Sequence, residues 1–266
     1  GPVRHSSEFG DSHAWAGRDV LIIGTGTSGH DIAQDLYSNG GRPTLVQRSP
    51  VSVFSIEPSG QLPYTLYSEG PPLADCDLIA AATPLAPLRD AHRRMTAQAR
   101  EIDRPLLEAL KARGFQLDEI DETGWLFKYI ERGGGYYFNV GCSDLIASGA
   151  VPLLPAAEID TFTSDGVRLR DGSERRADLI VLATGYHGPT RMARELFGAA
   201  IADRVGPIWG FSADDQEIRN LWGRTRQPGL WFQAGSFAQC RIYSKFLAMQ
   251  IKAVELGLTG PQADEE

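Results

Sequence analysis

The sequence predicts an α/β fold built around a parallel sheet, and three observations lead to this prediction. The continuous apolar run Val20–Ile23 is typical of a parallel strand that is buried on both faces. The glycine-rich turn Gly24–Gly29 follows it directly and opens a helix that ends at Gly40 and Gly41. Thr44–Val46 then forms a second apolar run. These segments have the order and length of one strand–helix–strand unit.

Composition narrows the class of protein. The 266 residues suffice for one large domain or two small ones, and a hydrophobic fraction of 42% allows a sizeable core. The net charge of -8 argues against a general nucleic-acid binder. No apolar run has transmembrane length and no signal peptide is evident, so we expect a cytoplasmic protein without a membrane. Neither the cysteines nor the histidines form a known ligand motif, so we expect no metal site.

The middle of the chain is predicted to be irregular at first and then helical. Residues 50–87 are rich in Pro, Gly and Ser, which is typical of irregular structure with short elements. Leu88–Arg113 has the pattern of an amphipathic helical region that is broken near Pro105. A short helix is expected at Ser143–Ala147, with Ser143 or Asp144 as its cap.

The second half is predicted to contain several short strands and a final helix. The expected strands are Val151–Leu154, Glu158–Phe162, Gly166–Arg170, Asp178–Ala183 and Leu230–Phe232. Apolar residues at helical spacing predict a helix over Ser244–Leu256. The acidic tail after Gly260 is expected to be disordered.

The turn after the first strand has the pattern G-x-G-x-x-G. Gly24 allows a tight turn, Gly26 lets the backbone approach a pyrophosphate, and Gly29 lets helix and strand pack closely. The free N–H groups at the start of the following helix can then bind phosphate oxygens. We therefore expect a Rossmann-like dinucleotide site, the alternative being a glycine turn without a ligand. Its candidate residues are Gly24, Thr25, Gly26, Thr27, Ser28 and Gly29.

The end of the second strand favours NADP(H) over NAD(H). NAD-binding proteins usually place an acidic residue there for the ribose hydroxyl, whereas this chain has Gln47, Arg48 and Ser49. An arginine suits a 2′-phosphate through its charge and its paired donors. We expect all three residues to bind the cofactor, although Arg48 could also be an ordinary solvated arginine.

Several further motifs make the chain resemble the flavin-containing monooxygenases and their Baeyer–Villiger relatives. Gly1–Phe9 matches the later part of the family signature F-x-G-x-x-x-H-x-x-x-(Y/F/W). The other similar segments are the Gly24–Gly29 loop, Gln47–Pro50, Gly133–Tyr137, Ala183–Tyr186 and Arg241–Lys245.

This resemblance implies an NADP-binding Rossmann-like domain over residues 1–150, with a helical insertion. It also implies the carboxyl-terminal part of a second, FAD-type α/β domain over 151–266. The family's upstream glycine motif for FAD is not in this sequence, so we expect a fragment with an incomplete FAD site. The resemblance further implies that His5, the candidate catalytic residue, and Ser6 lie near the nicotinamide. Ala183, Thr184, Gly185 and Tyr186 would approach the flavin.

The function implied is an FAD- and NADPH-dependent monooxygenase that transfers one oxygen atom from O2 to a small organic substrate. One alternative is a non-catalytic NADP-binding module that needs a partner chain. Another is a flavin-dependent NADPH reductase, against which the lack of a Cys-x-x-Cys pair weighs. The strands after Val151 are expected to lie in a second sheet with an exposed edge, which favours a homodimer or a second chain.

Overall fold

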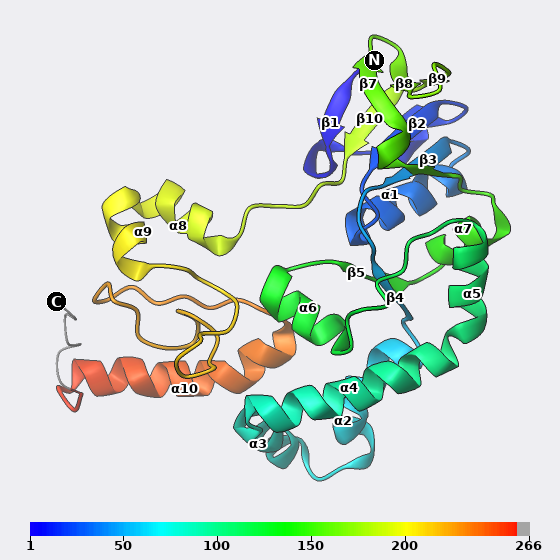
Figure 1. The fold of residues 1–266 in the computed structure, drawn as a ribbon. Helices are drawn as coiled ribbons and strands as arrows, with labels where there is room; N and C mark the ends of the chain where they lie inside the picture. The colour runs from blue at the N-terminus through cyan, green and yellow to red at the C-terminus, as the bar shows by residue number, and fades with distance from the viewer. Residues whose placement is uncertain (260–266) are drawn as a thin grey trace. The chain divides into compact units, whose positions relative to one another are not determined.

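The structure is a computed structural model that describes residues 1–259, and its contacts divide the chain into two units. The sheet unit comprises Gly1–Pro63, Asp90–Tyr129 and Gly134–Gly185. The carboxyl-terminal unit comprises Tyr64–Arg89, Ile130–Gly133 and the described residues from Tyr186 onward. Figure 1 shows the elements of each unit along the chain.

A five-stranded sheet with only parallel pairs forms the centre of the sheet unit, in the order β1-β10-β2-β3-β6. Its strands are β1 (Val3–His5), β10 (Leu179–Leu182), β2 (Asp19–Ile23), β3 (Arg42–Gln47) and β6 (Leu153–Pro155). Helix α1 (Thr27–Ser38) connects β2 to β3. The strand–helix–strand prediction is therefore confirmed. The apolar run of β2 is buried as expected, since Ile22 is fully inaccessible to solvent.

Different layers cover the two faces of this sheet. On one face, Val20 and Ile22 share a core with Ala33 and Leu36 of α1. On the other face, Leu21, Val46 and Ile180 pack with residues of a three-stranded antiparallel sheet, among them Val167 and Leu169. That sheet consists of β7 (Ile159–Thr163), β8 (Gly166–Leu169) and β9 (Glu174–Arg176). The sequence predicts β7 and β8 but not β9, which is short and fully polar.

The expectation that all strands after Val151 lie in a second sheet is wrong for β6 and β10. Strand β10 pairs with β2 from Leu179↔Val20 onward, and β6 pairs with β3. The run Leu179–Leu182 is apolar on both faces, so the middle of a parallel sheet buries it better than an edge does. The edges of the sheet are β1 and β6, with three residues each.

The region between β3 and β6 holds more regular structure than the sequence predicts. A two-stranded parallel sheet pairs β4 (Ser52–Ser55) with β5 (Tyr136–Asn139). Helices α4 (Leu85–Ile102) and α5 (Arg104–Ala112) confirm the predicted helical region and its break before Pro105. Helix α6 (Gly124–Arg132) is an addition.

The predicted cap of α7 (Cys142–Ser148) is wrong. The side-chain oxygen of Asn139 accepts hydrogen bonds from the backbone N–H groups of Gly141 and Ser143, at 2.9 and 3.1 Å. An Asn upstream of the helix therefore satisfies the donors that Ser143 or Asp144 was expected to satisfy.

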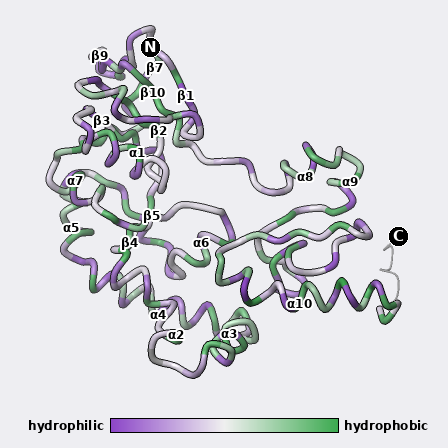
Figure 2. The backbone as a smooth tube through the Cα atoms, turned by 180° about the vertical axis from the view of Figure 1, so that it is seen from behind, coloured by the Kyte–Doolittle hydropathy of each residue, from purple (hydrophilic) through white to green (hydrophobic). Residues whose placement is uncertain are grey.

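The carboxyl-terminal unit is made of helices and loops. Its helices are α2 (Thr65–Glu69), α3 (Leu73–Ala82), α8 (Pro189–Phe197), α9 (Ala199–Val205) and α10 (Phe237–Glu255). Helices α2 and α3 lie in the stretch for which the sequence predicts irregular structure with short elements. In Figure 2, apolar and polar residues alternate along α10, as in an amphipathic helix. Among residues 1–259, no helix is both long and apolar enough to cross a membrane.

Two predictions in this unit need correction. Residues 230–232 form no strand, and Phe232 instead packs into a core with Trp222 and Leu247. Helix α10 begins at Phe237 rather than at Ser244, because Ser236 and Gln239 form a reciprocal capping box. The tail after Gly260, expected to be disordered, lies outside the described residues.

Candidate functional site

The predicted site residues of the sheet unit gather at the carboxyl ends of the parallel strands, which we call the carboxyl edge of the sheet. Parallel strands end on the same side, and β1, β10, β2 and β3 are consecutive neighbours. His5 ends β1 and Ser6 follows it, Ala183–Gly185 follow β10, Gly24–Gly29 follow β2, and Arg48 and Ser49 follow β3. The chain proceeds from β2 to β3 and β6 on one side, while β10 and β1 lie on the other, so β2 marks a topological switch point. Ligands of open α/β sheets bind at such points.

Two glycines of the loop are required by close backbone contacts. Gly24 has a φ of +122°, and a Cβ on it would lie 2.3 Å from the carbonyl oxygen of Ala183. A Cβ on Gly29 would lie 2.1 Å from the carbonyl oxygen of Gly24. Both distances are far below any real carbon–oxygen contact, so each position excludes a side chain.

Gly26 differs from the other two, because nothing inside the protein requires a glycine there. Its φ of -81° suits any residue, and a Cβ would meet no atom within 4 Å. The backbone at Gly26 is therefore open to a ligand. This is the property that the close approach of a pyrophosphate needs, and the loop fits a dinucleotide on this count.

Gly26 is also the N-cap of α1, and no side chain caps the helix. The first amides of a helix have no acceptor inside it and carry a partial positive charge. No acidic residue lies in the first turn of α1 to compete for these amides. Of the predicted residues here, Thr25 is buried, Ser28 is half-buried and Thr27 is exposed. This helix start can accept an anion.

His30 contacts the glycine loop from the interior of the protein. It is not among the site residues that the sequence predicts. Its Nδ1 lies 3.1 Å from the carbonyl oxygen of Gly26. A carbonyl only accepts, so Nδ1 carries the proton. The ring is fully buried and stacks on Tyr137 with centroids 3.9 Å apart. Burial lowers the pKa of His30 to about 4, which keeps the imidazole neutral near pH 7.

The turn after β3 presents Arg48 and Ser49 to solvent, while Gln47 is buried. No ion pair joins Arg48 to any other described residue, so its guanidinium is available to a phosphate. The amide of Gln47 instead bonds to the backbone of Gln116 and Ser49. Direct contact between Gln47 and a cofactor stays a prediction, and the structure gives its side chain a supporting position.

His5 joins the segments that follow β1 and β10. Its Nδ1 accepts a hydrogen bond from the backbone N–H of Ser7 at 3.3 Å, so Nε2 carries the proton. Nε2 lies 3.0 Å from the carbonyl oxygen of Gly185 and donates to it. Thr184, Gly185 and Tyr186 are exposed, whereas Ala183 packs below Gly24. The two predicted linking motifs thus meet through one hydrogen bond.

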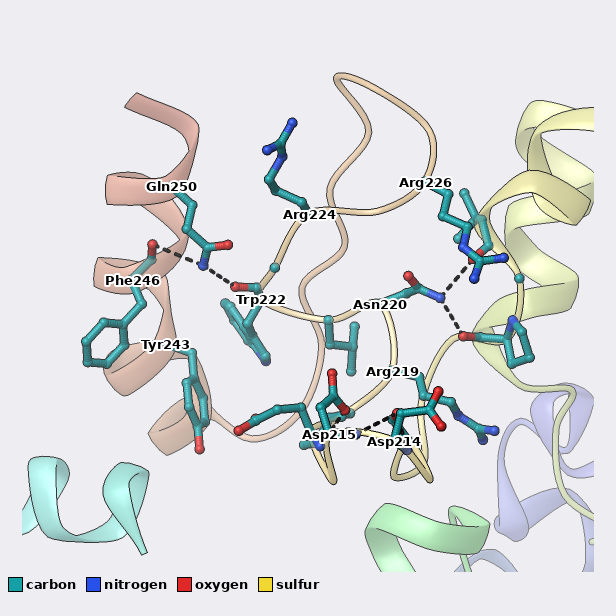
Figure 3. A pocket seen from close by; sticks show the side chains of 18 of the residues that line it. Asp214, Asp215, Arg219, Asn220, Trp222, Arg224, Arg226, Tyr243, Phe246 and Gln250 are labelled. Carbon is teal, nitrogen blue, oxygen red and sulfur yellow. Dashed lines mark hydrogen bonds between the residues drawn. The ribbon is translucent and has the colours of Figure 1, made fainter. Parts of the chain in front are cut away.

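A separate cavity of about 970 Å³ lies within the carboxyl-terminal unit (Figure 3). Its lining combines the aromatic rings of Trp222, Tyr243 and Phe246 with polar groups that include Arg219, Asn220 and Asp215. None of the predicted site residues lines it. This cavity and the strand ends that carry the nucleotide motifs are therefore different places.

No family model matches the chain, but individual proteins do. Over 186 residues it is 29% identical to indole-3-pyruvate monooxygenase YUCCA1 of Oryza sativa subsp. japonica, which covers 70% of this chain and 41% of that protein. It is 27% identical over 191 residues to the probable indole-3-pyruvate monooxygenase YUCCA3 of Arabidopsis thaliana, covering 70% of this chain and 38% of that one. The chain thus spans about two fifths of the length of these relatives.

Among solved structures, a cyclohexanone-bound cyclohexanone monooxygenase in the rotated conformation matches 97% of this chain and 58% of its own. The TM-score is 0.55 at 14% identity, a likeness that concerns the fold. The sequence relatives are monooxygenases, and the fold resembles that of the cyclohexanone monooxygenase. The motif resemblance is therefore confirmed, and the chain is similar to monooxygenases in both sequence and fold.

Proposed function

We propose that the sheet unit binds NADPH at the carboxyl edge of its parallel sheet. The observation that carries this proposal is that the predicted motifs converge at the switch point. Gly26 lies among them, and no protein atom lies near the position of a Cβ on it. A purely structural turn would not explain why position 26 is a glycine, since its φ and its surroundings accept any small residue.

Each part of the edge has a role in this proposal. Gly24–Gly29 and the first amides of α1 would hold the pyrophosphate, because they offer donors and no side chain intervenes. Arg48 and Ser49 would bind the 2′-phosphate through charge and hydrogen bonds. His5 and Ser6 would lie on the nicotinamide side. NADPH, when bound, supplies a hydride, while the protein orients it and excludes water.

We further propose that the whole activity is that of an FAD- and NADPH-dependent monooxygenase acting with O2 on a small organic substrate. The support is the likeness to monooxygenases over about two fifths of their length. Ala183–Tyr186 would approach the FAD, because they follow β10 beside the glycine loop and three of them are exposed.

Of the expected domains, we retain the nucleotide-binding role for residues 1–150. We propose that the strands up to Leu182 belong to the same domain, since β6 and β10 complete its sheet. The remaining residues would form part of the FAD-type domain. A cytoplasmic location, and a homodimer or second chain that completes the FAD site, are further parts of the proposal.

The alternative of a non-catalytic NADP-binding module has one specific observation in its favour. The whole nucleotide edge is formed by the sheet unit, apart from Tyr186. Binding of NADPH therefore requires no FAD, and an absorption spectrum of the purified protein distinguishes the two proposals. A flavin band near 450 nm supports the monooxygenase, whereas NADPH binding by a colourless protein supports the module.

The test of the NADPH proposal is a fluorescence titration with NADPH and with NADH. We expect the wild-type protein to prefer NADPH, and Arg48→Ala to weaken NADPH binding by about tenfold or more, since a charge-assisted bond contributes about 1.5–3 kcal/mol. NADH binding should hardly change. Arg168→Ala removes an exposed arginine elsewhere on the sheet unit and is the matched control. A wild-type protein that binds neither nucleotide would refute the proposal.

A further inference from the structure

We propose that Gln47 determines the preference for NADPH over NADH without touching the cofactor. It would do so by fixing the turn that carries Arg48 and Ser49 onto a distant segment, around Gln116. This inference rests on the proposed NADPH site. It assigns a positioning role to a residue that the sequence predicts as a direct ligand.

The amide of Gln47 is fully engaged by backbone atoms of the protein. Its Nε2 donates to the carbonyl oxygen of Gln116 at 2.9 Å and to that of Ser49 at 3.2 Å. Its Oε1 accepts from the N–H of Gln116 at 2.8 Å. Both amide protons are used, and the residue is only 3% exposed. Gln47 therefore has no donor left for a phosphate group.

A primary amide suits this position because Gln116 offers one donor and one acceptor. A carboxylate could accept from the N–H of Gln116 but would face two carbonyl oxygens. An apolar side chain would remove the bonds to the N–H of Gln116 and to the carbonyl oxygen of Ser49, and it would leave the carbonyl oxygen of Gln116 with only the bond from the N–H of Val51. The bond to Ser49 reaches directly into the turn. Loss of the amide would therefore free the backbone that sets the direction of Arg48 and Ser49.

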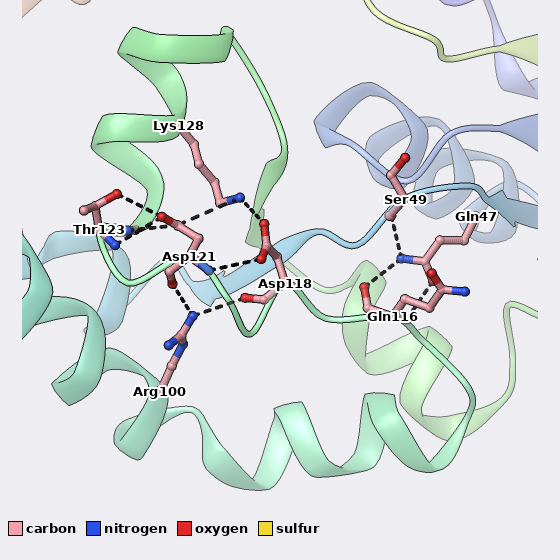
Figure 4. Close-up of polar contacts among 9 residues, drawn as sticks. Gln47, Ser49, Arg100, Gln116, Asp118, Asp121, Thr123 and Lys128 are labelled. Atoms are coloured by element: carbon pink, nitrogen blue, oxygen red, sulfur yellow. Dashed lines mark hydrogen bonds and ion pairs between the residues drawn. The ribbon is translucent and has the colours of Figure 1, made fainter.

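The segment around Gln116 is itself held in place by backbone hydrogen bonds and ion pairs. Val51 forms a parallel bridge with Leu117, in which the N–H of Asp118 donates to the carbonyl oxygen of Val51 and the N–H of Val51 donates to that of Gln116. Lys128, whose side chain is only 4% exposed, forms ion pairs with Asp118 and Asp121. Arg100 donates to the carbonyl oxygens of these two residues (Figure 4). A buried cation that bonds to two carboxylates resists displacement, because separation leaves unpaired buried charge.

The experiment is a double-mutant cycle on nucleotide affinity with Gln47→Met, Arg48→Ala and the double variant. Met keeps the length of the side chain and removes its hydrogen bonds. We expect Gln47→Met to weaken NADPH binding by about tenfold and NADH binding by less than about twofold, because only the 2′-phosphate uses the turn. The double variant should bind NADPH no more weakly than Arg48→Ala alone, since Gln47 acts through Arg48.

Controls separate this idea from a general loss of folding. Gln61→Met makes the same change at an exposed position of the sheet unit, where the amide donates to the carboxylate of Glu57. It should leave both affinities unchanged. Gln47→Glu is a second probe, which should shift the preference in the same direction as Gln47→Met. Thermal unfolding of each variant shows whether the fold persists.

The outcomes distinguish failure of this inference from failure of the NADPH site. A wild-type protein that does not discriminate the nucleotides removes the proposed function and the inference together. A discriminating wild type with unchanged preference in Gln47→Met and Gln47→Glu overturns the inference alone. Additive losses in the double variant overturn it too, since they would mean that Gln47 contacts the cofactor independently of Arg48.

Discussion

The glycine loop after β2 and the turn after β3 lie on neighbouring strands, yet different forces fix their shapes. Backbone atoms fix the glycine loop, since Gly24 lies against Ala183 and Gly29 lies against Gly24. A side chain fixes the β3 turn, since the amide of Gln47 ties it to Gln116. The first arrangement depends on residues that lack a side chain, and the second depends on one particular side chain.

This difference teaches that substitutions in the two places have different consequences. A side chain in the glycine loop creates an overlap that affects folding itself. A change in the β3 turn removes hydrogen bonds and alters which ligand fits. The loop should therefore control stability and binding together, and the turn should control specificity.

The largest expected effect belongs to Gly24→Ala. The substitution combines a positive φ with a Cβ 2.3 Å from the oxygen of Ala183. Strain and overlap should together lower the free energy of unfolding by at least about 3 kcal/mol. Urea unfolding followed by circular dichroism measures this loss. Gly10→Ala is the control, because Gly10 also has a positive φ, of +75°, but no atom lies near its Cβ. Equal losses at both positions would contradict the role given to Ala183.

A smaller effect is expected from pH. Burial lowers the pKa of His30 and of His92 from 6.5 to about 4. The unfolded chain binds these protons more readily, so each contribution to stability is full above pH 6.5 and is lost as the pH falls toward 4. The loss is about 3 kcal/mol for each residue at the lower limit. Unfolding measured between pH 7 and 4 shows it.

Two variants make this pH experiment specific to the glycine loop. His30→Leu and His92→Leu should each flatten the pH dependence by about one bound proton. His30→Leu should also weaken NADPH binding a few-fold (on the order of 1 kcal/mol for the lost bond to Gly26), whereas His92→Leu should not. Equal NADPH affinity in the two variants would show that the bond to Gly26 does not shape the loop.

The smallest effect on stability is expected at Gly26. A Cβ there meets no protein atom, so Gly26→Ala should change the free energy of unfolding by less than about 1 kcal/mol. NADPH binding should weaken by about tenfold, because the methyl group would occupy space that the pyrophosphate needs. Calorimetry measures both quantities. Unaltered binding in this variant would place the pyrophosphate away from Gly26.

The same comparison explains how much could be predicted from the sequence. The strand, loop and helix around Gly24–Gly29 are contiguous, so their pattern predicts both the fold and the site. The role of Gln47 depends on Gln116, which lies 69 residues further along the chain. Local periodicity carries no signal of such a contact. The supporting position of His30 could not be predicted for a related reason, since it depends on the contacts of the ring with Gly26 and Tyr137.

The carboxyl-terminal unit was harder to predict because its loops follow no regular pattern. Trp209, Gln216, Asn220 and Trp222 have positive φ values, which propensities do not foresee for such residues. The apolar segment Leu230–Phe232 has the composition of a strand, but it forms none, and Phe232 packs with Trp222 instead.

The hydrogen bond from His5 to Gly185 also has a mechanical consequence. It connects His5, at the end of β1, to the segment after β10, at Gly185, where the last stretch of the sheet unit ends. The two strands already pair in the sheet as far as His5 and Leu182, and this bond continues their connection beyond the last paired residues. Separation of Gly185 from His5 therefore requires the hydrogen bond to break, at a cost of about 1 kcal/mol.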